Sequence, residues 1–446
     1  MAGDSHIVQQ GPQEPRIDNA VDGRVAMADL RKGQPMGAKR ASIIALALAL
    51  GFAGIGLAVW RLSPLVGPAA EYRLPTGGPV NGRIAFTAEL PAPPSEEFVM
   101  CSDEPGPPDQ IYTARGDGTD LRQLTDGKTI KGSLAWSPDG TRLAFAAYDL
   151  EREAEQLLVM SSDGKDGGLV CEGCTATFWV PKEGETITFE GCYNGPGPYA
   201  NRLTWSPDGA TLAAPAHAVQ GVALIDVASG KIRTVETPGS VQGTSWSPDG
   251  SKLALSVRGA RAGGGLFVLE LETGKVMALL EAEPYAGSPP AWSPDGSLIA
   301  FARAVRDGAL RAEVDIVEEA AGRSQTILGS DDLFEVYDLA WSPDGTRLAV
   351  MHHPVDPPTA GILTIAADGS DVRLVALCES GRDKDGICSS NEGGFDWAPD
   401  GRALVFDNYD GEGRALSVVG LDGSVTPLSG DLVPGCCVAW QSVATD

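Results

Sequence analysis

Between residues 81 and 441, clusters of Gly, Pro, Asp and Ser divide the chain into short, largely hydrophobic stretches of about five to eight residues. A tryptophan ends one stretch, Ser-Pro-Asp-Gly follows, and a second stretch begins after it, as at Leu143–Phe145 and Leu348–Val350. Within this segment Pro fixes φ near −65°, Asp accepts hydrogen bonds from nearby backbone amides, and Gly adopts a left-handed conformation. The pattern predicts β-hairpins rather than long helices.

The Trp-Ser-Pro-Asp-Gly segment occurs five times, and a sixth copy has Ala in place of Ser. A second turn, Asp-Gly, follows in repeats such as those at Asp163 and Asp368, and Asp-Gly between apolar runs is a strong hairpin signal. Most steps between the tryptophans match the length of a four-stranded propeller blade, and such sheets must stack radially to bury both faces. The structural repeat tryptophans are Trp136, Trp205, Trp246, Trp292, Trp341, Trp397 and Trp440.

The strands at the two ends of the repeat region indicate how the ring closes. Residues 81–86 fit a second strand without a Trp hairpin before it, and residues 437–440 fit a first strand without a blade after it. We therefore expect the C-terminal strand to complete the first blade of an all-β, seven-bladed β-propeller, with six or eight blades as alternatives. The eight-bladed alternative depends on residues 178–189, whose spacing favours an inserted hairpin pinned by cysteines.

Residues 41–60 form an apolar stretch without a single charged side chain. Twenty helical residues span roughly 30 Å, the thickness of the hydrocarbon core, so an N-terminal transmembrane signal-anchor helix is predicted. Lys39 and Arg40 directly before it place the N-terminus in the cytoplasm. A cleaved secretory signal is the alternative. The expected organisation is a disordered cytoplasmic tail (1–40), the anchor (41–60), a tether (61–80) and the propeller (81–441).

The net charge of −26 lies almost entirely beyond residue 40, because residues 1–40 hold six Lys and Arg against five Asp and Glu. Such an acidic chain repels phosphate backbones, which argues against nucleic acid as a partner. The charge is expected to keep an exported domain soluble.

All eight cysteines lie on one side of the predicted membrane segment, and this even number predicts disulfides in an oxidising compartment. Strands alternate in direction, so the Ser-Pro-Asp-Gly and Asp-Gly turns share one end of the ring, here named the turn face. The other connections share the opposite end, the loop face, where we expect the cysteines and the longest loops. A Cys378–Cys388 pair and a bond from Cys101 to Cys436 or Cys437 are expected. The candidate disulfide residues are Cys101, Cys171, Cys174, Cys192, Cys378, Cys388, Cys436 and Cys437.

The sequence predicts no catalytic, cofactor-binding or metal-binding residue. A Gly-x-Ser-x-Gly nucleophile motif is absent. The pair His352-His353 lacks spaced partners and is expected in a solvated loop. Cys171-x-x-Cys174 fits a structural disulfide better than a redox or zinc site. Acidic side chains in the axial channel leave a bound cation as an alternative.

The repeat resembles the TolB-type β-propeller family, which is similar to WD-repeat proteins. The Trp-Ser-Pro-Asp-Gly turn carries the resemblance, together with residues 111–125, which match that family's third and fourth strands. The resemblance covers residues 81–441 and implies the fold. It does not fix the function, because propellers host binding proteins and enzymes alike.

We expect a non-catalytic scaffold in a bacterial cell membrane, single-pass, with the propeller outside the cytoplasm. Its partner would be an unknown protein, peptide or glycan at the loop face. Long loops braced by disulfides on a rigid scaffold are common binding sites. The alternatives are a hydrolase or lactonase with a metal in the axial channel, and a transmembrane sensor.

Overall fold

The computed structural model describes most of the predicted propeller region. The chain divides into Met1–Pro64 and Leu65–Asp446, and every described residue belongs to the second part. Among the described residues, no helix is long and apolar enough to cross a membrane. The predicted tail, anchor and tether lie outside them. The described residues are 82–89, 109–149, 152, 154–172, 203–216, 220–259, 264–282, 284, 288–306, 310–329, 333–354, 361–377, 394–409, 414–428 and 432–442.

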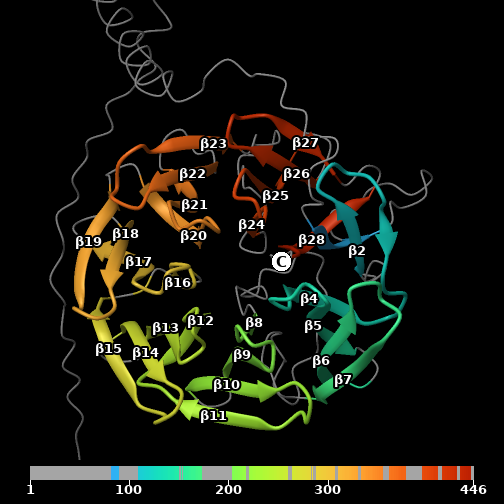
Figure 1. Cartoon of the computed structure of the whole chain (residues 1–446), viewed down its shortest axis with the longest axis horizontal. Coiled ribbons are helices and arrows are strands. Elements are labelled where there is room, and N and C mark those ends of the chain that lie inside the picture. The colour runs from blue at the N-terminus through green and yellow to red at the C-terminus, as the bar shows by residue number, and fades with distance from the viewer. Residues whose placement is uncertain are drawn as a thin grey trace, which may run out of the picture. The chain divides into compact units, whose positions relative to one another are not determined.

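Seven four-stranded antiparallel sheets surround a central axis as the blades of a propeller (Figure 1). The predicted all-β, seven-bladed fold is therefore confirmed, and the alternatives of six and eight blades do not apply. From the innermost strand outward, blade 1 is β28 (Val433–Trp440), β1 (Arg83–Glu89), β2 (Gln110–Arg115) and β3 (Arg122–Gln123); blade 2 is β4 (Ile130–Trp136), β5 (Arg142–Asp149), β6 (Ala154–Ser161) and β7 (Gly167–Glu172). Blade 3 is β8 (Thr204–Trp205), β9 (Thr211–Ala216), β10 (Gly221–Asp226) and β11 (Ile232–Glu236); blade 4 is β12 (Ser240–Trp246), β13 (Lys252–Arg258), β14 (Gly265–Glu270) and β15 (Val276–Glu281). Blade 5 is β16 (Ala291–Trp292), β17 (Leu298–Arg306), β18 (Leu310–Glu318) and β19 (Arg323–Gly329); blade 6 is β20 (Leu333–Trp341), β21 (Arg347–Pro354), β22 (Gly361–Ala366) and β23 (Arg373–Leu377); blade 7 is β24 (Phe395–Trp397), β25 (Ala403–Tyr409), β26 (Arg414–Gly420) and β27 (Val425–Pro427).

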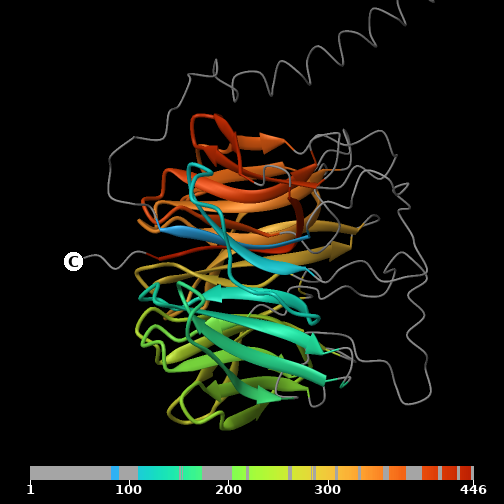
Figure 2. The ribbon, with the colours of Figure 1, turned by 90° about the vertical axis from the view of Figure 1, so that its right-hand side faces the viewer.

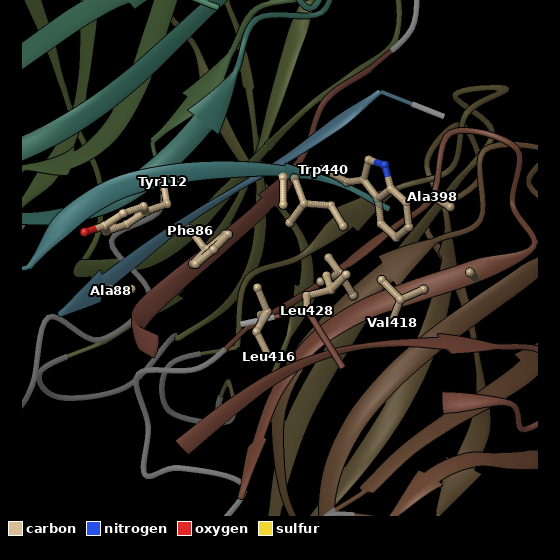
Figure 3. Close-up of a cluster of buried hydrophobic side chains, with 12 residues drawn as sticks. Phe86, Ala88, Tyr112, Ala398, Leu416, Val418, Leu428 and Trp440 are labelled. Carbon is tan, nitrogen blue, oxygen red and sulfur yellow. The ribbon is translucent and has the colours of Figure 1, made fainter. Parts of the chain in front are cut away.

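The two ends of the propeller meet in blade 1, where β28 pairs antiparallel with β1 and Trp440 lies opposite Ile84. Trp440 also packs into a hydrophobic cluster shared with blade 7, together with Phe86, Leu416 and Val418 (Figure 3). The last described strand therefore buries apolar surface on the first and the last blades at once, which favours a closed ring.

The repeat turn is held by hydrogen bonds within the motif itself. In the five Ser-containing copies the Ser hydroxyl donates to the Asp carboxylate at 2.5–2.6 Å. The same carboxylate accepts from the backbone N–H two residues on, at 3.0 Å. The closing Gly has φ between 65° and 74° in all six copies, a left-handed conformation that strains other residues.

Tryptophan side chains connect neighbouring blades near the axis. In five blades the indole N–H donates to the carbonyl oxygen of the residue directly before the repeat Trp of the preceding blade. These bonds join Trp136 to Ala439 (3.2 Å), Trp205 to Ala135 (3.0 Å), Trp246 to Thr204 (3.1 Å), Trp341 to Ala291 (3.0 Å) and Trp397 to Ala340 (3.0 Å). Trp292 differs: its Nε1 has no hydrogen-bond partner within the described ranges.

The two kinds of hairpin turn lie at the same end of each blade, as backbone hydrogen bonds such as Val227 N to Ala210 O and Leu271 N to Ser251 O demonstrate. Figure 2 shows the strands running between this turn face and the opposite loop face. The expectation of a solvated loop at His352-His353 was wrong, because both residues lie within β21 and His352 is buried.

Candidate functional site: a groove between blades 3 and 4

A groove of about 550 Å³ opens on the turn face between blades 3 and 4. One wall is the turn from β8 to β9 with the ends of β10 and β11, and the other is the turn from β12 to β13 with the residue after β14. The lining residues are Ser206, Pro207, Asp208, Thr211, Leu224, Asp226, Lys231, Ile232, Arg233, Trp246, Asp249, Gly250 and Leu271. The hairpin turns of two adjacent repeats therefore form both sides of the groove.

An apolar surface lies within the groove. Trp246 is partly exposed, whereas the other six repeat tryptophans are no more than 8% exposed. Leu224 is buried behind it, and Ile232 at the start of β11 is 47% exposed. The groove thus presents a tryptophan and an aliphatic side chain to solvent together. The repeat tryptophan is buried in every other blade, whereas aliphatic residues on the outermost strand are also exposed in blades 2 and 7.

Three carboxylates surround this apolar surface, and each is held in its ionised form. The Ser247 hydroxyl, with the backbone and side chain of Ser251, lowers the pKa of Asp249 to about 2. The Ser206 hydroxyl likewise lowers the pKa of Asp208, and Ser229 lowers that of Asp226. Lys231 and Arg233 line the same groove, so its charged groups are mixed and predominantly acidic.

The residue two places after the turn glycine explains why the groove is open. In blade 2 this residue is Arg142, whose guanidinium lies 4.8 Å from the ring centroid of Trp205 in blade 3. Its Nη2 also donates to the Gly209 carbonyl oxygen at 2.7 Å. In blade 3 the same position holds Thr211, whose short side chain cannot extend over the next tryptophan. The space that Arg142 fills between blades 2 and 3 is therefore open between blades 3 and 4.

The described residues contain only part of the predicted cysteine set. Cys171 on β7 is disulfide-bonded, and no described side chain is its partner. Cys437 is a free thiol whose Sγ accepts a hydrogen bond from the backbone N–H of Ser133 at 3.2 Å. The candidate disulfide at Cys437 is therefore corrected: the sulfur is directed at blade 2 within the ring. Cys436 lies in β28 without a described side chain, and the remaining candidates, Cys101, Cys174, Cys192, Cys378 and Cys388, lie outside the described ranges.

One buried cation lies near the loop face. Burial lowers the pKa of Lys131 to about 8, against the opposing effect of Asp109 and Asp126. Its Nζ donates to the Gln110 side chain at 2.9 Å and to the Thr129 carbonyl oxygen at 2.8 Å. With these acceptors, Lys131 stabilises the connection between blades 1 and 2. Within the described ranges, no group of three or more His, Cys, Asp or Glu side chains could hold a metal ion.

Reasoning from the sequence missed the groove, because the motif residues were assigned a purely structural role. The signal lies two residues after each turn glycine, where the repeats carry Arg142, Thr211, Lys252, Leu298, Arg347 and Ala403. Lys252 also crosses to the next blade and forms an ion pair with Glu319 at 2.6 Å. Arg347 instead turns back to Asp371 of its own blade at 2.8 Å. Whether such a side chain contacts the next blade or its own blade depends on the residues that surround it in the folded protein. The sequence pattern does not show which residues these are.

Seven radially stacked sheets with blade-crossing tryptophans define a β-propeller protein. Residues 202–430, just over half of the chain, match the TolB beta propeller domain family. The chain belongs to this family, as the repeat motif indicated.

Two curated relatives and one solved structure illustrate the similarity. An uncharacterized peptidase of Bacillus subtilis is 29% identical over 177 residues, 40% of this chain and 22% of the relative. A TolB homolog of Chlorobium luteolum is 32% identical over 170 residues, 37% of this chain and 32% of the relative. The chain therefore spans less than a third of the curated relatives it matches. An oligogalacturonate lyase in complex with manganese superposes with a TM-score of 0.50 at 15% identity, covering 77% of this chain and 84% of that one, which shows the fold alone.

Proposed function

We propose that this protein is a non-catalytic scaffold, anchored in the membrane by residues 41–60, whose extracytoplasmic propeller binds a partner protein. The observation that carries the proposal is the groove between blades 3 and 4, where Trp246 and Ile232 are exposed beside ionised carboxylates. Partly exposed aromatic and aliphatic side chains within a polar rim are typical of protein-binding surfaces. Membership of the TolB beta propeller domain family supports the proposed scaffold role.

The proposal moves the expected binding surface. The cysteine-rich loop face, predicted as the partner site for a protein, peptide or glycan, lies mostly outside the described residues and stays a prediction. The groove proposed here as the partner site lies on the opposite, turn face. We favour binding over the hydrolase, lactonase and sensor alternatives because the groove offers a surface for a partner side chain.

Site-specific photo-crosslinking in the native envelope tests the proposal. A photoreactive phenylalanine analogue replaces Ile232 in the groove, and a matched variant carries it at Val425 on blade 7. Both positions are exposed apolar residues on outermost strands, at 47% and 55% exposure. The expected result is a discrete crosslinked protein from position 232 that is absent or at least about tenfold weaker from position 425. Equal labelling from both positions, or none from either, would reject a partner at this groove.

Membrane anchoring and sidedness are tested separately. A cysteine-free region such as residues 1–40 can carry an engineered thiol, and membrane-impermeant labelling of intact cells should not reach it. Extraction with alkaline carbonate should leave the protein in the membrane pellet. Release by carbonate would contradict the anchor without affecting the binding groove.

A further inference from the structure

We propose that the groove between blades 3 and 4 takes an arginine side chain of the partner protein. Its guanidinium lies over the Trp246 indole and donates a hydrogen bond to the Gly250 carbonyl oxygen. This inference rests on the proposed binding function and adds the chemistry of the contact.

The protein itself supplies the template for this contact. Between blades 2 and 3, Arg142 lies over Trp205 at 4.8 Å and donates to the Gly209 carbonyl oxygen at 2.7 Å. Trp205 is only 7% exposed beneath it. A guanidinium over a tryptophan face gains a cation–π attraction, and the charged donor strengthens the bond to the carbonyl. One repeat further on, Trp246 and Gly250 occupy the positions of Trp205 and Gly209.

The missing component is the arginine. Thr211 stands where Arg142 stands one blade earlier, and it lines the groove together with Trp246 and Gly250. A threonine side chain ends one bond beyond Cβ, whereas an arginine extends four bonds further and ends in a planar fork. Thr211 therefore keeps the spacing of the repeat but leaves the tryptophan and the carbonyl to an external group.

The carbonyl oxygens of two other turn glycines accept side-chain hydrogen bonds. Between blades 1 and 2, the Gln441 side chain donates to the Gly140 carbonyl oxygen at 2.6 Å. Gly140 and Gly209, which receive these donors, are buried, while Gly250 is partly exposed, as are the turn glycines Gly296, Gly345 and Gly401. The Gly250 carbonyl oxygen thus lies at a repeat position where two other turn glycines receive a side-chain donor, and in this repeat the adjoining Trp246 is partly exposed.

The charges of the groove favour a cation. Asp208 and Asp249 flank the site with lowered pKa values and are ionised at neutral pH. Lys231 and Arg233 line the same groove, and Nη1 of Arg233 donates to the carbonyl oxygen of Leu271, another groove residue, at 3.2 Å. The three aspartates of the groove outnumber its two cations, so one partner guanidinium would balance its charge. Arginine fits better than lysine because its flat, weakly hydrated head can stack and donate at once.

Fluorine NMR of the full-length protein in detergent tests the proposal. The tryptophans carry 5-fluorotryptophan, and the Trp246 resonance is assigned by its loss in Trp246→Phe. The probe is N-acetyl-arginine amide, and the control is N-acetyl-citrulline amide, which has the same length without the charge. We expect the Trp246 resonance to shift saturably with the arginine probe, with a dissociation constant on the order of 10 mM for one isolated side chain. The citrulline control should shift it at least about fivefold less.

Substitution at Thr211 provides the decisive variant. Thr211→Arg should supply the missing side chain, displace the Trp246 resonance without any probe, and weaken probe binding at least about tenfold. Thr211→Ser should leave both unchanged. As a gain-of-function counterpart, Arg142→Thr should open a second groove, so that the probe now also shifts the Trp205 resonance. This second variant keeps the test open if Thr211→Arg does not fold.

The outcomes separate this inference from the proposed function. No Trp246 shift up to about 50 mM arginine probe, or equal shifts with citrulline, would overturn the arginine site. Unaltered probe binding in Thr211→Arg would do so too. If the crosslink from position 232 then persisted, the scaffold function would stand and only the arginine contact would fail. Loss of that crosslink in Thr211→Arg, with retention in Thr211→Ser, is the expected joint result.

Discussion

The indole N–H of Trp136 donates a hydrogen bond of 3.2 Å to the carbonyl oxygen of Ala439, joining residues 303 positions apart in the chain. Trp136 ends the innermost strand of blade 2, and Ala439 lies in the strand that completes blade 1. The same bond recurs between other neighbouring blades, so the join between the chain ends uses the repeat's ordinary contact. The strand that closes the ring is therefore joined to blade 2 by the same indole hydrogen bond that joins other neighbouring blades.

Replacing Trp136 with phenylalanine should destabilise the propeller more than the same replacement at Trp292. Both tryptophans are 8% exposed, but among the described residues Nε1 of Trp292 has no partner. Both variants therefore lose the same side-chain volume, but only Trp136→Phe also loses an indole hydrogen bond. The free energy of unfolding should fall by about 1 kcal/mol more in Trp136→Phe, as measured by urea denaturation. Equal losses in the two variants would mean that the indole hydrogen bond contributes nothing.

A chain that ends at Cys436 should lose most of its cooperative unfolding. It lacks the half of β28 that pairs with Ile84 and Phe86 and carries Trp440 into the cluster between blades 7 and 1. Removal of such a large buried side chain alone costs about 3–5 kcal/mol, much of the stability of a typical domain. Circular dichroism during heating measures this, with a chain ending at Ser442 as the control. An unchanged melting temperature would contradict closure by β28.

Arg142→Ala should lower the free energy of unfolding by about 1–2 kcal/mol, because it removes the contact with Trp205 and the bond to the Gly209 carbonyl oxygen. Thr211→Ala changes the equivalent position one blade later and should cost about 0.5 kcal/mol or less, since it removes no such contact. Acrylamide should also quench tryptophan fluorescence more strongly in Arg142→Ala. If the two alanine variants were equally stable, the inter-blade arginine contact would be negligible.

Acid should weaken the propeller through the repeat turns. The Ser hydroxyls and backbone amides lower the pKa values of Asp139, Asp208, Asp249, Asp295 and Asp344 below the usual range. A carboxyl whose folded pKa is lowered stabilises the fold above its unfolded pKa of about 3.9, and this stabilisation is lost as the pH falls through the folded value. Stability should therefore decline between about pH 4 and pH 2.

A single hydroxyl isolates this effect. Ser247→Ala removes the largest cause of the lowered pKa of Asp249, so that carboxyl should titrate at a higher pH in carbon-detected NMR. The stability of the variant should also depend less on pH between about pH 4 and pH 2 than that of the wild type. The copy with Ala398 shows that the turn forms without the hydroxyl. An unaltered titration of Asp249 in the variant would exclude the serine as the cause.

The repeat made the fold predictable, because each motif residue has a local role that neighbours do not override. Pro, Asp and Gly specify the turn, and the two incomplete repeats expected at residues 81–86 and 437–440 predicted how the ring closes. His352 shows where this local reasoning fails. A histidine pair reads as polar and solvated, yet β21 runs through it because strand pairing with β20 continues to Pro354.

The groove was harder to foresee, because it arises from one long side chain that is missing. Thr211 is an ordinary strand residue when considered alone. Its short side chain becomes significant only by comparison with Arg142, which extends over the tryptophan of the next blade. Cys437 poses a similar problem. Counting cysteines suggested a disulfide, but the direction of one side chain toward Ser133 depends on the twist and register of β28.

The pairing of β28 with β1 also governs when this protein can finish folding. Among the described strands, β28 is synthesised after all the others, and under the proposed topology it also crosses the membrane after them. Until then the edge of β1 lacks its partner, while blades 2 to 7 already have all four strands. A prematurely terminated chain would expose that edge and the apolar surface of blade 7, and proteases of the envelope could distinguish it from the finished product.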